Sequence, residues 1–220
     1  MISEKPFGVI FDMDGVLVDS ARPHLRSWQL LAEENGASVT PEQFASTFGQ
    51  QNRDIIPTLF GPVSDTRLTA LADRKERLYR DLVREDPPIV DGAVSLVRSL
   101  HEAGAGLAVG SSGPRANIDL VLTAMGVQNC IEMVVSGDDV TRGKPDPQVF
   151  TLAVEHLGIP SAHCVVIEDA PVGIAAARAA GTRCVAVLMH HPAESFSGAD
   201  LIVPRLSDLS IDELVSLARR

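Results

Sequence analysis

The stretch FGVIFDMDGV, residues 7–16, decides the fold of this chain. Its first half, Phe7–Phe11, is a nearly continuous apolar run, which is typical of a strand buried on both faces of a parallel sheet. Two aspartates, Asp12 and Asp14, follow directly. Residues two apart on an extended chain face the same side, and ligands of open α/β sheets bind beyond the carboxyl ends of the strands. The stretch therefore predicts a buried strand that leads into a functional loop.

Four further short apolar runs repeat the pattern of this first strand, and a fifth is a candidate. None of them alternates apolar with polar residues, and helix-length segments with a 3.6-residue apolar period lie between them. This order of strands and helices predicts an α/β core with a doubly wound, Rossmann-like parallel sheet. The runs are Gly106–Val109, Met133–Val135, Cys164–Ile167 and Cys184–Leu188, with Leu201–Val203 as the candidate.

One long segment interrupts the alternation of strands and helices. Between about Ser20 and Pro87 there is no strand pattern, and apolar residues recur at helical spacing instead. Within it, the sequence Thr40-Pro-Glu-Gln43 has the form of a capping box with proline at the first helical position. We predict an all-helical cap over residues 19–88, inserted into an α/β core that comprises residues 1–18 and 89–220.

The charge of the chain argues against nucleic acid or an anionic membrane surface as the main partner. The 220 residues include 19 lysines and arginines against 29 aspartates and glutamates, which gives a formal net charge of −10. An acidic protein is repelled by phosphate backbones. A small anionic substrate remains compatible with this charge, because a local cluster of donors can hold it. The composition, 45% hydrophobic and 22% charged, is that of an ordinary globular protein.

The cysteines and the N-terminal sequence favour a reducing compartment. The three cysteines are too few and too scattered for a disulfide framework, and no pair has the spacing of a zinc site. The first residues lack the long apolar stretch of a signal peptide, and no run approaches the roughly 20 apolar residues of a membrane span. We therefore expect a cytoplasmic protein.

Polar motifs stand beside the other predicted strands, as Asp12 and Asp14 stand beside the first. Taken alone, each motif also fits a turn, a helix cap or a solvated loop. In a parallel sheet, however, the loops that follow the strands lie at one edge, so the motifs are expected to converge there. They are Ser111-Ser112 just before a helix, Lys144 in a loop before another helix, and Glu168-Asp169 after a strand.

The combined motifs suit a phosphoryl group. Four converging carboxylates repel one another unless a hard divalent cation lies among them, and oxygen-only ligands favour Mg²⁺ over zinc. Hydroxyl and free N–H groups at a helix start bind phosphate oxygens, and a lysine neutralises their charge. The sequence therefore predicts a magnesium site that handles phosphate.

With these motifs in this order, the sequence resembles the haloacid dehalogenase-like superfamily. Within it, the chain is similar to the group with a small α-helical cap that contains β-phosphoglucomutase and many sugar-phosphate phosphatases. The start FDMDGV is highly specific, and the four motifs and the cap insertion match over nearly the whole chain.

The resemblance implies a role for each motif residue. Asp12 matches the nucleophile that forms an aspartyl-phosphate. Asp14 matches the general acid that protonates the leaving oxygen and later deprotonates water. An aspartate at position 14 also points to a phosphate ester, because dehalogenases and phosphonate-cleaving members lack an acid there. The phosphate-binding residues are then Ser111, Ser112 and Lys144, and the Mg²⁺ site comprises Asp12, the backbone carbonyl of Asp14, Glu168 and Asp169, some of them acting through water.

Three cap residues are candidates for substrate contact. Lys75 falls on an apolar helical stripe, so it either snorkels or points into a cleft, and the resemblance favours the cleft. His24 matches a mutase histidine near the reacting sugar hydroxyl, although a helix-end histidine is an equal interpretation. Trp28, one turn further on, is expected in the core rather than under a sugar. In the loop Gly49–Arg53, Arg53 falls one place later than the mutase arginine that holds a second phosphate.

These features favour a Mg²⁺-dependent phosphatase that hydrolyses a small phosphate monoester, a sugar phosphate, through an aspartyl-phosphate. The alternative is a phosphosugar mutase of the β-phosphoglucomutase type, which the displaced Arg53 disfavours. A second alternative is a non-catalytic binding protein on the same fold, which the intact motif residues disfavour. The expected partner is a small phosphorylated metabolite, with no nucleic acid and no membrane, and the chain is expected to be a monomer or a weak homo-oligomer.

Overall fold

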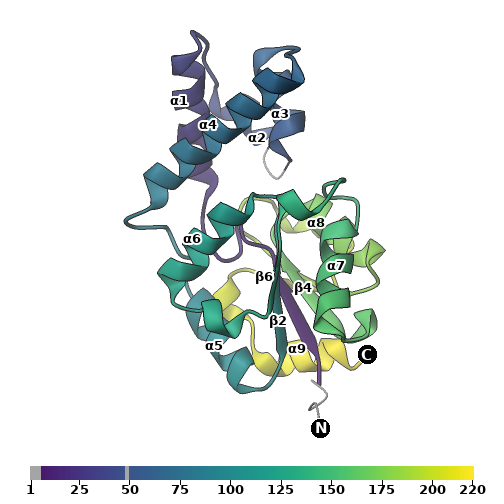
Figure 1. Ribbon diagram of the computed structural model, residues 1–220. Coiled ribbons are helices and arrows are strands. Elements are labelled where there is room, and N and C mark those ends of the chain that lie inside the picture. Colours follow the sequence, from purple (N-terminus) through teal and green to yellow (C-terminus); the bar gives the residue numbers. More distant parts are fainter. Residues whose placement is uncertain (1–5, 48–49) are drawn as a thin grey trace.

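The computed structural model describes residues 6–47 and 50–220, and its centre is one parallel sheet (Figure 1). Six strands lie in the order β3-β2-β1-β4-β5-β6, and each neighbouring pair is parallel. This arrangement confirms the predicted α/β, doubly wound, Rossmann-like class. The strands are β1 (Gly8–Phe11), β2 (Gly106–Gly110), β3 (Met133–Val135), β4 (Cys164–Glu168), β5 (Arg183–Val187) and β6 (Leu201–Val203).

Helices cover both faces of the sheet, which explains why its strands show no alternating pattern. On one face, α5, α6 and α9 pack against Val9 and Phe11 of β1. On the other face, α7 and α8 pack against Ile10 (Figure 1). No helix in the described part of the chain is long and apolar enough to cross a membrane. These helices are α5 (Ala93–Glu102), α6 (Arg115–Met125), α7 (Gln148–Leu157), α8 (Pro171–Ala179) and α9 (Ile211–Ala218).

Helices α1 to α4 lie at one end of the sheet and have a hydrophobic cluster of their own (Figure 1). Trp28, Ile56 and Leu71 are among its buried members, so Trp28 is a core residue as expected. The predicted capping box is present, because the Thr40 hydroxyl accepts from the Gln43 N–H at 3.2 Å and the Gln43 side chain accepts from the Thr40 N–H at 2.9 Å. The helices are α1 (Ala21–Glu34), α2 (Pro41–Ala45), α3 (Asn52–Phe60) and α4 (Asp65–Val83).

Two chain segments that connect these helices to the sheet run side by side. The Asp19 N–H donates to the Pro88 carbonyl at 2.8 Å, and the Val90 N–H donates to the Leu17 carbonyl at 3.0 Å. The helices of the cap therefore leave and rejoin the core at one place. The division at residues 18/19 and 88/89 stays a prediction.

Candidate active site

The sheet brings the predicted motifs to one edge. β1 lies between β2 and β4, and Phe11 at its end is level with Val109 of β2 and Ile167 of β4. The residues that follow these three positions therefore emerge side by side. This edge is also where the strand order reverses, which is the usual ligand site of such sheets.

Three carboxylates form a buried cluster at this edge. Asp12, Glu168 and Asp169 each offer an oxygen, and these oxygens lie within 4.8 Å of one another. Burial raises the pKa of Asp12 to about 8, and the charges of Glu168 and Asp14 add to the effect while Lys144 opposes it. Burial and the neighbouring carboxylates also raise the pKa of Asp169 well above its usual value. The repulsion is of the kind that a cation placed among the carboxylates would relieve.

Lys144 is the buried cation of this cluster. Its ammonium donates to Asp12 Oδ1 at 2.6 Å, to Glu168 Oε1 at 2.7 Å and to the Gly110 carbonyl at 3.2 Å. Burial alone would lower its pKa, but the negative charges of Asp12 and Glu168 raise it instead. Lys144 is therefore charged and held against the predicted nucleophile.

The donor set fits a hard divalent cation. Asp169 Oδ2 is buried and has no hydrogen-bond partner among the described residues, which marks an oxygen available to a metal. The other acid is already engaged, because Glu168 Oε2 accepts from the N–H groups of Asp169 and Ala170, both at 2.8 Å. Gly15 gives the site its room: a Cβ there would lie 1.9 Å from Asp169 Oδ2, and its φ of +82° is one that glycine adopts readily. The available ligands are oxygens, as Mg²⁺ requires.

The serine motif lies at the end of β2 and before α6. Ser111 is fully buried, and its hydroxyl accepts from the Gly113 N–H at 3.1 Å, which shapes a tight turn. Ser112 is partly exposed and lines the space between core and cap. Both residues thus lie where the sequence places the phosphate-binding loop, and their contact with phosphate stays a prediction.

Asp14 points away from the acidic cluster, toward the cap. The Ser20 hydroxyl donates to Asp14 Oδ1 at 2.5 Å, and His24 Nε2 lies 3.3 Å from the same oxygen. Burial opposes ionisation of Asp14, but the adjacent His24 and the hydrogen bonds from His24 and Ser20 lower its pKa overall. The Asp14 side chain thus contacts Ser20 and His24 rather than the acidic cluster, and its role in proton transfer stays a prediction. The predicted metal contact through its backbone carbonyl stays a prediction.

His24 and Lys75 extend this contact into the cap. Lys75 Nζ lies 2.7 Å from His24 Nδ1. Because an ammonium has no acceptor, Nδ1 accepts this hydrogen bond and Nε2 carries the proton that faces Asp14. The His24 ring stacks on Tyr79, with centroids 4.0 Å apart. Lys75 is only 3% exposed. It lines a cleft rather than snorkelling, and His24 is buried rather than an exposed helix-end residue.

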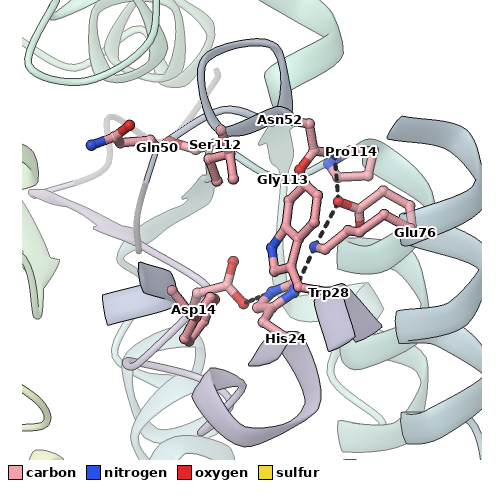
Figure 2. A pocket seen from close by; sticks show the side chains of 12 residues that line it. Asp14, His24, Trp28, Gln50, Asn52, Glu76, Ser112, Gly113 and Pro114 are labelled. Atoms are coloured by element: carbon pink, nitrogen blue, oxygen red, sulfur yellow. Dashed lines mark hydrogen bonds and ion pairs between the residues drawn. The ribbon is translucent and has the colours of Figure 1, made fainter. Parts of the chain in front are cut away.

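A pocket lies between the cap and the core. We call it the cap–core pocket; its lining includes Asp14, His24, Trp28, Lys75, Glu76 and Ser112. Figure 2 shows Asp14 and His24 at one wall and Glu76 at another, with the Trp28 ring between them. Trp28 thus serves the cap core and also presents ring surface to the pocket.

Arg53 is not brought to the cap–core pocket. Its side chain is exposed, bonds to Gln51, and lines a neighbouring hollow instead. The start of the predicted substrate loop, Gly49, lies outside the described residues.

Sequence reasoning missed two residues that contact the predicted site. Ser20 was expected only at the boundary of the cap, yet its hydroxyl bonds to Asp14. Glu76 follows Lys75 directly, yet it falls off the apolar stripe that drew attention to the lysine. Its carboxylate bonds to Lys75 Nζ at 2.9 Å. The only sequence signal for Glu76 was an acid next to a lysine, which is common on exposed helices.

Comparisons with known proteins agree with this geometry. A sequence model of the family described as haloacid dehalogenase-like hydrolase matches residues 9–187. The chain is 31% identical to the fructose-1-phosphate phosphatase of Escherichia coli, over 84% of this chain and 97% of that protein. It is 30% identical to the β-phosphoglucomutase of Bacillus subtilis, over 94% of this chain and 92% of that protein. The crystal structure of β-phosphoglucomutase from Clostridium difficile covers 96% of both chains with a TM-score of 0.87 at 23% identity, and so shares the fold.

Proposed function

The chain belongs to the haloacid dehalogenase-like hydrolases, and we propose that it is a Mg²⁺-dependent phosphatase that hydrolyses a sugar phosphate through an aspartyl-phosphate on Asp12. The observation that carries the proposal is the pairing of two differently placed aspartates. Asp12 is held by Lys144 at the end of β1, whereas Asp14 is turned toward the pocket by Ser20 and His24. This arrangement supports a division of roles in which Asp12 attacks phosphorus and Asp14 moves a proton.

The reaction follows from this pairing. An Asp12 oxygen attacks phosphorus, the bond between phosphorus and the ester oxygen breaks, and Asp14 gives its proton to the leaving oxygen. Water then attacks phosphorus, Asp14 takes a proton from it, and phosphate leaves as Asp12 is restored. Lys144 and the Ser111 loop hold the phosphoryl oxygens. Asp12, Glu168, Asp169 and the Asp14 carbonyl would hold Mg²⁺, some of them through water, and the bound ion would supply positive charge to those oxygens.

The lowered pKa of Asp14 suits the second half of this cycle, in which it acts as a base. The first half needs a protonated Asp14. A substrate phosphate next to Asp14 is a like charge, and like charges raise the pKa of a carboxyl. Substrate binding therefore favours the acid form at the step that uses it.

A phosphosugar mutase is the second candidate. The contact of His24 and Lys75 with the Asp14 side of the site favours it, as does the similarity to the Bacillus subtilis mutase. The exposed position of Arg53, outside the cap–core pocket, favours the phosphatase.

A panel of sugar phosphates tests the proposal. Each is incubated with Mg²⁺ or with excess chelator, and both free phosphate and isomerised sugar phosphate are measured. Phosphate release that needs Mg²⁺ and is lost in Asp12→Asn is expected. Interconversion of hexose 1- and 6-phosphates that depends on a bisphosphate primer would establish the mutase instead, and full turnover in chelator would exclude the metal-dependent mechanism.

A further inference from the structure

Glu76 is the most heavily bonded acid of the cap–core pocket. Its Oε1 accepts from Lys75 Nζ at 2.9 Å and from Asn52 Nδ2 at 2.7 Å, and its Oε2 accepts from Asn117 Nδ2 at 2.6 Å. Figure 2 shows the bond between Asn52 and Glu76 at the wall of the pocket. A carboxyl whose two oxygens both accept from donors in a buried place is held in the ionised form.

The ion pair between Glu76 and Lys75 neutralises the positive charge that Lys75 brings to the pocket from the cap. Lys75 and His24 are the basic residues among the described residues that line it. The Lys75 ammonium is directed at His24 and Glu76, and it also lies 5.3 Å from the centre of the Trp28 ring. Lys75 is therefore fully engaged by the protein before any ligand arrives.

The charge of the pocket then disfavours an anionic leaving group. Asp14 and Glu76 contribute two negative charges against one from Lys75. A second phosphate on the leaving group would find no uncompensated cation among the described residues that line the pocket, and burying its charge there is costly. The uncharged residues of the lining suit the hydroxyl groups of a ligand, because Asn52 and Ser112 offer hydrogen bonds and Trp28 offers an apolar ring.

We propose that Glu76 is a specificity-determining residue: by neutralising Lys75, it makes the cap–core pocket accept uncharged, hydroxylated leaving groups and reject leaving groups that carry a second phosphate. The proposal rests on the proposed phosphatase function and defines its substrate class as monophosphates of neutral sugars or polyols. Glu76 acts here through Lys75, without being a catalytic residue.

A purely structural role is the competing explanation. Asn117 belongs to α6 of the core, so its bond to Glu76 of α4 joins cap and core, and Arg80 bonds to the same Asn117 at 2.9 Å. Loss of a structural link would lower activity on all substrates alike. Loss of charge compensation would instead change the ratio of the activities on a monophosphate and on a bisphosphate.

The test compares a hexose 1-phosphate with the corresponding 1,6-bisphosphate on wild type and Glu76→Gln. The amide keeps the size of the side chain and removes its charge. We expect the wild type to prefer the monophosphate in kcat/KM, and Glu76→Gln to reduce that preference about tenfold, as one unit charge a few ångströms away implies. Asp81→Asn is the matched control, because it removes the same charge from the exposed side of α4 and should leave the ratio unchanged.

The outcomes separate the two proposals. If the wild type hydrolyses monophosphates but Glu76→Gln changes both substrates equally, the role of Glu76 is wrong and the phosphatase stands. If the wild type releases no phosphate from any monophosphate, the phosphatase itself is wrong. Should Glu76→Gln fail to fold, inhibition of the wild type decides: we expect the bisphosphate to bind more weakly than the monophosphate, and tighter binding would overturn the proposal.

Discussion

Replacing Glu76 with glutamine is expected to remove a pH-dependent part of the stability of the protein. Burial would raise the pKa of this carboxyl, but Lys75, His24 and the hydrogen bonds from Asn52 and Lys75 lower it to about 2. A carboxyl whose pKa is lower in the folded than in the unfolded state stabilises the fold above its unfolded pKa. That contribution is lost as the pH falls toward the folded pKa.

The size of the effect follows from the two pKa values of Glu76. The difference between a pKa of about 2 in the folded state and the ordinary glutamate pKa of 4.5 corresponds to about 3 kcal/mol at neutral pH, at about 1.4 kcal/mol for each pKa unit. At pH 3 the remaining contribution is about 1 kcal/mol by the same relation. The stability gap between wild type and Glu76→Gln should therefore narrow by about 2 kcal/mol between pH 7 and pH 3.

Urea denaturation of both proteins in a series from pH 7 to pH 3 measures this gap. Asp81→Asn serves again as control, since its carboxylate is exposed and its gap to wild type should stay small throughout. A gap between wild type and Glu76→Gln that does not depend on pH would refute the reasoning. It would mean that the carboxyl titrates normally, and that Lys75 is not neutralised in the folded protein.

Four further substitutions test the site. Gly15→Ala forces a Cβ against Asp169, so we expect about a 10- to 100-fold loss of Mg²⁺ affinity, read from the metal dependence of turnover, and normal metal dependence would contradict the placement of Asp169. Asp14→Asn should cost about 10²- to 10⁴-fold on a sugar phosphate and much less on nitrophenyl phosphate, whose leaving group needs little protonation; equal losses would count against the acid role. Arg53→Ala should leave kcat/KM within about twofold whereas Lys75→Ala should raise KM or change substrate preference, and the reverse order of effects would favour the mutase.

The fold was predictable from the sequence because its signals are local. Each buried strand is a short apolar run, and the polar residue that matters comes directly after it, as Asp12 does after β1 and Glu168 at the end of β4. Parallel pairing then fixes that these ends meet, so the convergence of distant motifs needed no further information.

The contacts between the cap and the core at the cap–core pocket were not predictable in the same way. The contacts of Glu76 join residues that are 24 and 41 positions away in the chain, at Asn52 and Asn117. Such contacts depend on how the cap helices pack on the core, which spacing along one helix does not reveal. Arg53 is the converse case. Its sequence position in the predicted substrate loop indicated a contact with the pocket, but its side chain lines a neighbouring hollow instead.

The paired connectors have a consequence for how this chain can change. The two segments, near Asp19 and Pro88, are joined by the two backbone hydrogen bonds described above, so the ends of the inserted helices lie next to each other on the core. Closure of a loop between such ends costs little extra when the inserted sequence grows or shrinks, and exchange of an insert is tolerated best where its two ends adjoin. We therefore expect that the helices between them can be exchanged as one unit. A different set of helices grafted at these two segments would bring new leaving-group contacts, while Asp12, Lys144 and Asp169 would keep their places in the loops at the edge of the sheet.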